Sequence, residues 1–224
     1  MPVALITGAG GNLGQVAVSQ FLQKGWTVLA TVSPGKSWPG NPHPNLHCYA
    51  IDLRNQAAVS DWLREVFVSW NHIQAGLLLA GGFAPASLQQ ADGTSLKQML
   101  ALNAQTAWNV AQPLALHMMN RNNGRIFFIG ARTALHPENA AGALTYAFSK
   151  SLLFRFSEAI NHAGLQHNVR SYVLVPNIID TPDNRRAMPS ADFTSWVKPE
   201  YMVEIMIRLA DSGYQSEETV LRLY

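Results

Sequence analysis

The sequence predicts an α/β fold, a doubly wound parallel sheet with helices on both faces. Short, continuously apolar runs alternate with longer runs whose apolar residues recur at helical spacing. Apolar runs of this kind are typical of parallel strands that are covered on both faces. Alternation of strand and helix implies right-handed crossovers, and the first apolar run passes directly into a glycine-rich turn.

Each element follows from its local pattern. Helices are expected where apolar spacing is 3–4 residues, and Gly25 marks the end of the first. They cover Leu13–Lys24, Gln56–Ser69, Ser95–Asn120 and Ala143–His162. Strands are expected over Pro2–Thr7, Trp26–Val32, Leu46–Ile51, Gly76–Ala80, Gly124–Gly130 and Val169–Val175, with a further edge strand over Thr219–Leu223.

The 224 residues suit a single domain over 1–224. One stretch, 180–199, does not continue the alternation. It contains three prolines together with Phe193 and Trp196, and it follows the carboxyl end of a strand. Ligands bind at those ends in such sheets, so this stretch is expected to form a lid-like segment.

Composition excludes several classes of function. The formal net charge is +2 without a basic run, which argues against nucleic-acid binding. The single cysteine, Cys48, and the scattered histidines have no metal-ligand spacing, so no metal site is expected. No apolar run is long enough for a membrane span, and the N-terminus begins a strand directly. A cytoplasmic protein is the expectation.

The glycine-rich turn is the first candidate site. It reads Thr7-Gly8-Ala9-Gly10-Gly11-Asn12-Leu13-Gly14 between the first strand and the first helix. Backbone N–H groups in such a turn, with the helix dipole behind them, suit the pyrophosphate of a dinucleotide. Asn12 stands where a glycine is usual, and Asn tolerates positive φ. The alternative is a tight strand–helix turn without a ligand.

The end of the second strand bears on the choice of cofactor. Thr31-Val32-Ser33 contains no acid to bond an adenosine 2′-hydroxyl. Thr31, Ser33 and Lys36 could hold a 2′-phosphate, although no Arg is present there. NADP or NAD is expected, with NADP slightly favoured. Asp52 is placed to meet the adenine amino group, or alternatively to cap the helix that begins at Gln56.

Tyr146 and Lys150 are the candidate catalytic pair. Residues four apart share a helix face, so the phenol and the ammonium group point the same way. A nearby cation lowers the pKa of a phenol, and the Lys can also bond the nicotinamide ribose. This pair predicts a general acid for carbonyl or imine reduction.

With these motifs the whole chain resembles the short-chain dehydrogenase/reductase family, a Rossmann-type fold. The resemblance rests on the glycine turn, Tyr146-x-x-x-Lys150, Ala80-Gly81 after the fourth strand, and the segment from Pro176 to Thr181. It implies an NAD(P)-dependent oxidoreductase in which Asn103 joins Tyr146 and Lys150 in the catalytic set. The cofactor residues it implies are Thr7, Gly8, Gly10, Asn12, Leu13, Gly14, Thr31, Ser33, Asp52, Leu53, Ala80, Gly81, Gly82, Lys150, Pro176, Ile179 and Thr181.

The substrate end departs from the family pattern. Ala131 falls at the position of the family serine, and Thr133 lies two residues on. The run from Asp180 to Trp196 is similar to the branch of the family that reduces quinonoid dihydropterins without that serine. The resemblance implies a pterin-like or similarly activated substrate. The substrate residues it suggests are Ala131, Thr133, Phe83, Met188 and Trp196.

Three alternatives stay open from the sequence. The substrate could be another quinone or carbonyl compound. The protein could bind a dinucleotide as a redox sensor without turnover. The aromatic side chains of 180–199 could simply pack that segment onto the core. In each of these cases the family resemblance implies a homodimer or tetramer through the long helices 95–120 and 143–162.

Overall fold

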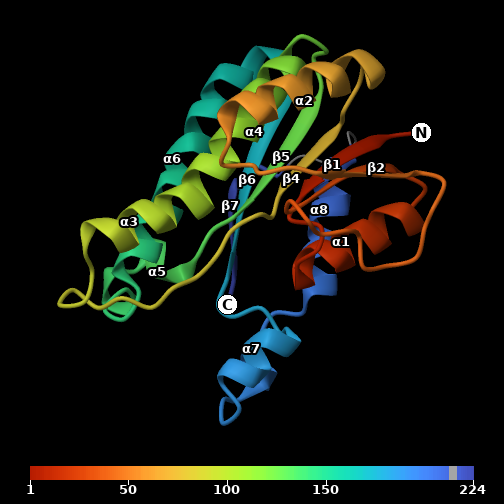
Figure 1. Cartoon of the computed structure of the whole chain (residues 1–224). Helices are drawn as coiled ribbons and strands as arrows, with labels where there is room; N and C mark the ends of the chain where they lie inside the picture. The colour runs from red at the N-terminus through yellow and green to blue at the C-terminus, as the bar shows by residue number, and fades with distance from the viewer. Residues whose placement is uncertain (212–215) are drawn as a thin grey trace.

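In the computed structural model, which describes residues 1–211 and 216–224, the strands form one parallel sheet. Across these residues the order is β3-β2-β1-β4-β5-β6-β7, so the order of the parallel strands reverses between β1 and β4 (Figure 1). The strands are β1 (Val3–Thr7), β2 (Thr27–Val32), β3 (Leu46–Ala50), β4 (Ala75–Leu78), β5 (Gly124–Ile129), β6 (Val169–Pro176) and β7 (Val220–Leu223). The predicted doubly wound fold, including the edge strand, is confirmed.

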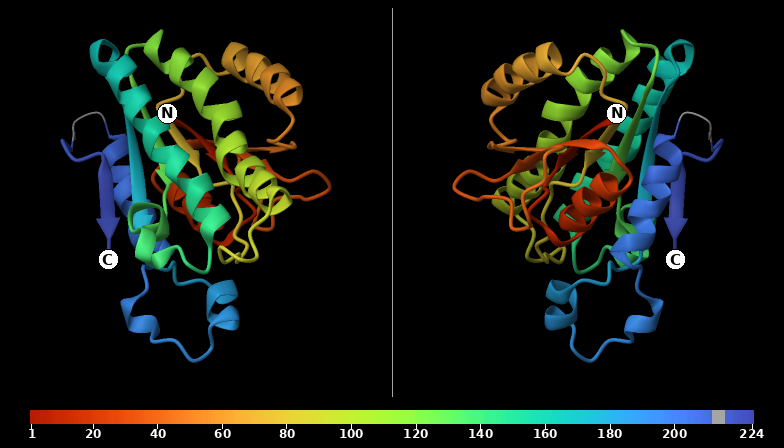
Figure 2. Two further views of the ribbon diagram at one scale, coloured as in Figure 1. Left: turned by 90° about the vertical axis from the view of Figure 1, so that its left-hand side faces the viewer. Right: turned by 90° about the vertical axis from the view of Figure 1, so that its right-hand side faces the viewer.

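Helices cover both faces of the sheet. On one face lie α2 (Gln56–Ser69), α4 (Thr106–Met119) and α6 (Leu144–Gly164), and on the other α1 (Asn12–Gln23) and α8 (Pro199–Ala210) (Figures 1 and 2). Successive strand residues point to opposite faces of the sheet and so belong to two hydrophobic cores. Leu5 and Phe128 pack towards α2, α4 and α6, and Ile6 and Phe127 pack towards α1 and α8. Because β1, β2, β4 and β5 are buried along their whole length, their apolar runs are continuous.

The predicted helix over 95–120 is interrupted. It consists of α3 (Gly93–Met99), a π-helical turn η1 (Leu100–Gln105) and α4. The start precedes the prediction because Asp92 and Ser95 form a reciprocal capping box, with Ser95 N donating to Asp92 Oδ1 at 2.7 Å and Asp92 N donating to Ser95 Oγ at 3.0 Å. A π-turn carries an extra residue, so the side chains after it point in a new direction.

Short elements follow the later strands. After β5 come α5 (Arg132–Leu135) and η2 (Pro137–Asn139), and η3 (Leu165–His167) precedes β6. After β6, α7 (Pro182–Ala187) and η4 (Phe193–Ser195) project below the body of the molecule (Figure 2). Asp180 N donates to Val197 O at 2.8 Å and Val197 N donates to Ile178 O at 2.8 Å, which closes the base of this segment.

The ends of β1 and β4 approach closely. Gly8 has φ +67, and a Cβ on it would lie 2.8 Å from Ala80 N. A Cβ on Gly14, in the first turn of α1, would overlap Gly8 O and lie 2.8 Å from Ala9 Cα. Both glycines are therefore required for α1 to begin directly above the β1 end.

Gly14→Ala is expected to lower the free energy of unfolding by at least about 2 kcal/mol, because the added methyl group meets rigid backbone. Gly93→Ala is the control, since a Cβ there has open space in the first turn of α3. Urea denaturation of both variants measures the difference. Equal stability of the two would contradict the steric argument.

Candidate active site

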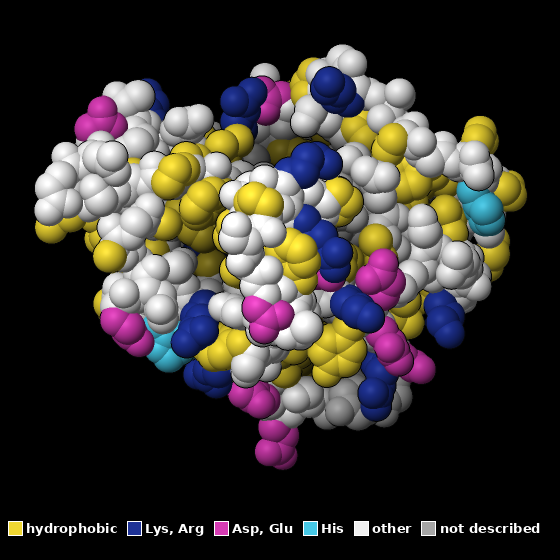
Figure 3. All heavy atoms as spheres, turned by 90° about the horizontal axis from the view of Figure 1, so that it is seen from below, with side chains coloured by type: hydrophobic (Ala, Val, Ile, Leu, Met, Phe, Trp, Pro, Cys, Tyr) yellow, Lys and Arg dark blue, Asp and Glu magenta, His cyan; other side chains and the backbone are white. Residues whose placement is uncertain are grey.

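A cavity of about 450 Å³ opens at the carboxyl edge of the sheet, where the strand order reverses. In doubly wound sheets this position is the usual ligand site. Seen from below (Figure 3), this face carries apolar side chains with basic and acidic ones beside them. The cavity is lined by Gly8, Gly11, Thr31, Val32, Ser33, Pro34, Ile51, Asp52, Leu53, Arg54, Leu79, Ala80, Gly81, Leu102 and Thr106.

The ends of β2 and β3 form one wall of the cavity. Ile51 N donates to Val32 O at 3.0 Å, so residues that follow the two strands are neighbours. Thr31 is buried, and its hydroxyl has no hydrogen-bond partner among the described residues. A buried hydroxyl in this state is suited to a ligand that enters the cavity.

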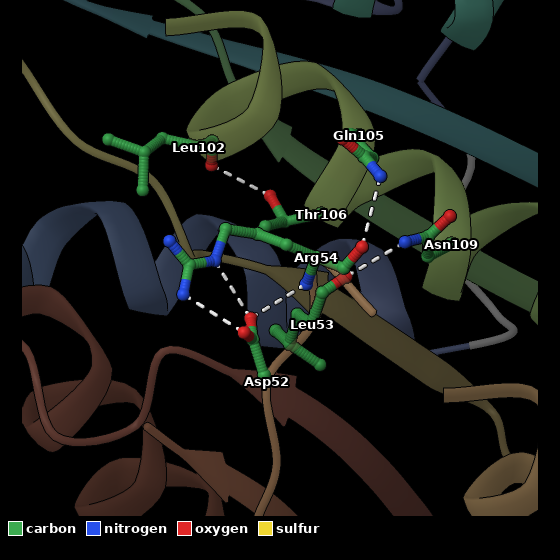
Figure 4. A network of polar contacts seen from close by, with 7 residues as sticks. All are labelled: Asp52, Leu53, Arg54, Leu102, Gln105, Thr106 and Asn109. Carbon is green, nitrogen blue, oxygen red and sulfur yellow. Dashed lines mark hydrogen bonds and ion pairs between the residues drawn. The ribbon is translucent and has the colours of Figure 1, made fainter. Parts of the chain in front are cut away.

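Asp52 and Arg54 form a paired group inside the cavity (Figure 4). Arg54 Nε donates to Asp52 Oδ1 and Arg54 Nη2 to Asp52 Oδ2, both at 2.9 Å. The hydrogen bonds from Arg54 hold the pKa of the Asp52 carboxyl below its usual value. The alternative that Asp52 caps the following helix is wrong, because Asn55 is the N-cap and accepts from Ala58 N at 3.2 Å.

Side chains of the central helical run fix the backbone of this loop. Gln105 Nε2 donates to Arg54 O at 3.0 Å, and Asn109 Nδ2 donates to Leu53 O at 2.9 Å (Figure 4). Leu53 is buried between them and the core. The loop after β3 is thus held to α4, and Arg54 starts from a fixed position. Sequence reasoning missed Arg54.

The other predicted residues of the glycine turn contact either the neighbouring strand end, the first helix or the segment after β6. Thr7 Oγ1 accepts from Ala80 N at 3.1 Å and joins β1 to the end of β4. Gly10 O accepts from Gln15 Nε2 at 3.0 Å, and Leu13 packs against the core below α1. Asn12 is the first residue of α1 and does not have a positive φ, so the suggestion that Asn replaces a glycine there by adopting one is wrong. Within this turn Gly8 is the residue with a left-handed conformation. Its side chain instead donates to Asp183 Oδ2 of α7 at 2.5 Å.

Asn103 connects the end of β4 with α6. Its Oδ1 accepts from Gly82 N at 3.1 Å, and its Nδ2 donates to Gly82 O at 3.0 Å and to Ser149 Oγ at 3.1 Å. Ser149 Oγ in turn donates to Tyr146 O at 2.7 Å. Sequence reasoning missed Ser149, which connects Asn103 to the backbone of α6 at Tyr146. The π-turn η1 directs Asn103 into this position.

Gly81 lies between Asn103 and Lys150. A Cβ on Gly81 would be 2.6 Å from Asn103 Oδ1 and 3.5 Å from Lys150 Nζ. The same glycine lines the cavity, so the Lys150 ammonium group lies close to the cavity lining at this residue. The structure therefore brings the predicted dinucleotide residues and the predicted catalytic residues together at Gly81.

Lys150 and Tyr146 lie on one face of α6, as their spacing predicts. Lys150 is 7% exposed, and its Nζ donates to Ile129 O at the end of β5 at 2.9 Å. The Nζ atom lies 5.8 Å from the centre of the Tyr146 ring. Burial lowers the pKa of Lys150 to about 8.

The pKa of Tyr146 does not follow the expectation from the sequence. Burial raises the pKa of the phenol to about 12, whereas a neighbouring cation was expected to lower it. The reason is that desolvation dominates in this structure, while the Lys150 ammonium bonds the Ile129 carbonyl. At neutral pH Tyr146 is a protonated phenol, the form that a proton donor requires.

Three of the residues predicted to contact the substrate are Ala131, Thr133 and Phe83. Ala131 is buried before α5 and brings no hydroxyl. Thr133 Oγ1 is buried without a hydrogen-bond partner in the described ranges. The Phe83 ring contacts Tyr146 edge-on with ring centres 5.0 Å apart, and it is 64% exposed. An exposed aromatic ring beside the phenol offers a flat surface for a ring-shaped substrate.

The predicted residues of 176–199 lie at the end of β6 and along the projecting segment. Pro176 ends β6, Ile179 O accepts from Asn184 Nδ2 at 2.8 Å, and Thr181 caps α7. Met188 lies just beyond α7. Trp196 is buried against Phe193, with ring centres 4.6 Å apart, and lines a second cavity with Lys198 and Tyr201. In this arrangement Phe83 contacts Tyr146, and Trp196 packs at the base of the segment.

Within the described part of the chain, His, Cys, Asp and Glu side chains do not gather in groups of three that could hold a metal ion. Among the same residues, the helices are too short or too polar to span a membrane.

Comparison with known proteins places these features in context. The model of the family described as "short chain dehydrogenase" matches residues 2–191. The chain is 26% identical over 188 residues to acetoacetyl-CoA reductase of Acinetobacter sp., covering 80% of this chain and 75% of that enzyme. It is 28% identical over 166 residues to the NADP-dependent 3-hydroxy acid dehydrogenase YdfG of Escherichia coli, covering 69% of this chain and 63% of that enzyme.

Two further similarities are informative. The chain is 23% identical over 195 residues to dihydropteridine reductase of Dictyostelium discoideum, covering 86% of this chain and 80% of that enzyme. Among solved structures, ElxO with NADP bound superposes with a TM-score of 0.85 at 15% identity, over 99% of this chain and 96% of that one. At this identity the structural likeness shows the fold.

Lys150→Met is expected to raise the free energy of unfolding at pH 7 by up to about 3 kcal/mol, because it removes a buried cation whose pKa is about 8 against an ordinary 10.5. Between pH 8 and pH 10.5 the Lys150 amine binds more protons in the unfolded chain than in the folded protein. The free energy of unfolding of the wild type should therefore rise with pH from about 8 to 10.5. Urea denaturation from pH 7 to 10.5 measures both effects.

The exposed Lys97→Met is the matched control and should keep the wild-type pH profile. Parallel profiles for the wild type and Lys150→Met would contradict the lowered pKa.

Proposed function

Because the chain belongs to the short-chain dehydrogenase family, we propose that it is an NAD(P)H-dependent reductase of a quinonoid dihydropterin or a similarly activated substrate. The proposal rests on one observation above all. Gly81 lines the cavity at the β1–β4 switch point, and a Cβ on it would be 3.5 Å from the buried ammonium group of Lys150 on the helix that carries Tyr146. This closeness supports a dinucleotide pocket with a proton donor beside it.

The residues present fit a dinucleotide. Gly8 and Gly11 of the glycine turn line the cavity, and so does Thr31, whose hydroxyl has no partner among the described residues. Thr7, Gly8, Gly10, Asn12, Leu13 and Gly14 would surround the pyrophosphate, and Pro176, Ile179 and Thr181 the nicotinamide end. When bound, the reduced cofactor supplies a hydride.

Each catalytic side chain has a role that its contacts support. Tyr146 gives the proton of its hydroxyl to the reduced group of the substrate. Lys150 donates one N–H to Ile129 O, and its other two N–H groups are available to the cofactor ribose and to the phenol. Asn103 has its amide engaged by Gly82 and Ser149, so it acts as a positioning residue for α6.

The substrate class follows from the departures at the substrate end. Without a hydroxyl at Ala131, the site lacks the usual donor to a substrate oxygen, which favours electron-poor, activated substrates. The exposed Phe83 ring beside Tyr146 favours a flat heteroaromatic one. Similarity to a dihydropteridine reductase over 86% of the chain supports the same class. Met188 and Trp196 would contact the substrate if 180–199 closes as a lid over the single domain.

The first test is oxidation of NADH and NADPH with freshly generated quinonoid dihydropterin. Wild-type protein should turn over, and Tyr146→Phe should lose at least about 100-fold in kcat, since general acid catalysis typically contributes that much. Ser151→Ala, a hydroxyl loss on the exposed side of α6, is the control and should retain activity.

Tight nucleotide binding without turnover of the pterin would overturn the substrate assignment. Turnover of acetoacetyl or other carbonyl substrates would then indicate a carbonyl reductase, and no turnover at all a redox sensor. The Tyr146→Phe variant separates these results, because a sensor binds nucleotide unchanged when the phenol hydroxyl is removed.

We also propose a homo-oligomer, formed through α4 and α6, in the cytoplasm. Four large apolar side chains on these helices are about half exposed: Trp108, Leu116, Phe148 and Leu152. An apolar face of this size is costly to leave in water, and a second copy can cover it symmetrically. Cys48 is a free exposed thiol, which suits a reducing compartment.

Trp108→Glu is expected to convert the oligomer to a monomer, because it places a carboxylate in the centre of the interface. Val68→Glu, on the exposed surface of α2, should leave the oligomer intact. Sedimentation equilibrium measures the mass of each. A monomeric wild type would refute this interface.

A further inference from the structure

The end of β2 has neither of the side chains that usually distinguish the two nicotinamide dinucleotides. An acid there bonds the adenosine 2′-hydroxyl of NAD, and an Arg nearby receives the 2′-phosphate of NADP. Here Thr31, Val32 and Ser33 occupy the position. The cavity does contain a guanidinium, but it comes from the neighbouring strand end, at Arg54.

We propose that Arg54 receives the adenosine 2′-phosphate and so makes NADP(H) the preferred dinucleotide. This inference rests on the proposed function, since it concerns the same dinucleotide pocket. It assigns the phosphate contact to the loop after β3 instead of the end of β2.

The topology brings Arg54 to the required place. The hydrogen bond between Ile51 N and Val32 O sets the β3 end beside the β2 end. Ser33 and Arg54 consequently line the same cavity although 20 intervening residues separate them. A phosphate group bound at the β2 end would lie in the cavity that Arg54 lines together with Thr31 and Ser33.

The pairing with Asp52 leaves the correct edge of the guanidinium free. Asp52 engages Nε and one N–H of Nη2. The other N–H of Nη2 and both of Nη1 form a second edge, which has no hydrogen bond to any described residue. Two parallel N–H groups on that edge match two oxygens of a phosphate.

Arg54 is also held in advance. Gln105 fixes its carbonyl, and Asp52 fixes the orientation of its fork. Ordering of a long side chain is therefore largely complete before a ligand arrives, which favours binding. The side chains of Arg54 and Asp52 are 54% and 37% exposed, so this ion pair contributes little to folding stability by itself.

Thr31 supplies an independent observation. Its side chain is 1% exposed, lines the cavity and has an Oγ1 without a hydrogen-bond partner among the described residues. A buried hydroxyl needs a partner, and a ribose or phosphate oxygen of the ligand would be one. The hydroxyl of Ser33 lies next to the same space.

The experiment measures dissociation constants by calorimetry for NADPH and NADH, and for 2′,5′-ADP and 5′-AMP. Arg54→Ala should weaken NADPH and 2′,5′-ADP about 10- to 100-fold and change NADH and 5′-AMP less than about threefold. Arg54→Lys should recover at most part of the loss, because an ammonium cannot form the fork. Arg64→Ala, which removes an exposed Arg paired with Asp61 on α2, should change none of the four constants.

Equal weakening of the phosphorylated and unphosphorylated ligands would overturn the proposal, since it would indicate a contact with adenine or a loss of loop structure. An unchanged NADPH constant in Arg54→Ala would overturn it as well, as would full recovery by Lys. Circular dichroism and thermal unfolding check that each variant folds. If the wild type binds none of the four ligands, the proposed function itself fails, a result distinct from binding that ignores Arg54.

Discussion

The site depends on the pair of hydrogen bonds that the Asn103 side chain forms with the backbone N–H and C=O of Gly82. A primary amide has one acceptor and two donors, and Asn103 uses Oδ1 and Nδ2 on the two polar groups of Gly82 and reaches Ser149 as well. These bonds are buried, where a missing partner is costly. They tie the segment after the central strand β4, which lines the cavity, to α6, the helix that carries Tyr146 and Lys150.

These hydrogen bonds leave no room for a side chain at Gly81, where a Cβ would lie 2.6 Å from Asn103 Oδ1 and 3.5 Å from Lys150 Nζ. Lys150 in turn is kept in a poorly solvated position by one hydrogen bond to Ile129 O. A buried ammonium destabilises the fold relative to an apolar side chain, which is a cost of holding a cation beside the phenol. The raised pKa of Tyr146 has the same origin, since burial disfavours the charged form of both groups.

Much of this arrangement could be predicted from the sequence because it depends on local pattern. The strand–helix alternation, the turn at Gly8 and the Tyr146–Lys150 spacing each require only a few consecutive residues. The interruption of 95–120 by a π-turn was not predicted, because an amphipathic pattern continues through it. The partners of Asp52 and Asn12 were missed for another reason. Their contacts depend on a loop conformation and on how the segment 180–199 folds back, which propensity does not specify.

Arg54 illustrates the limit most clearly. Reading the chain in order assigns cofactor choice to the residues directly after β2, and there the sequence offers only hydroxyl groups and Lys36. In a parallel sheet, however, neighbouring strand ends share one surface, and their residues are separated in sequence by an entire crossover. The charge that one strand end lacks can be supplied by the other. Since Gln105 and Asn109 hold the β3 loop to α4, that charge is positioned by the helix opposite, and the choice of dinucleotide becomes a property of three elements together.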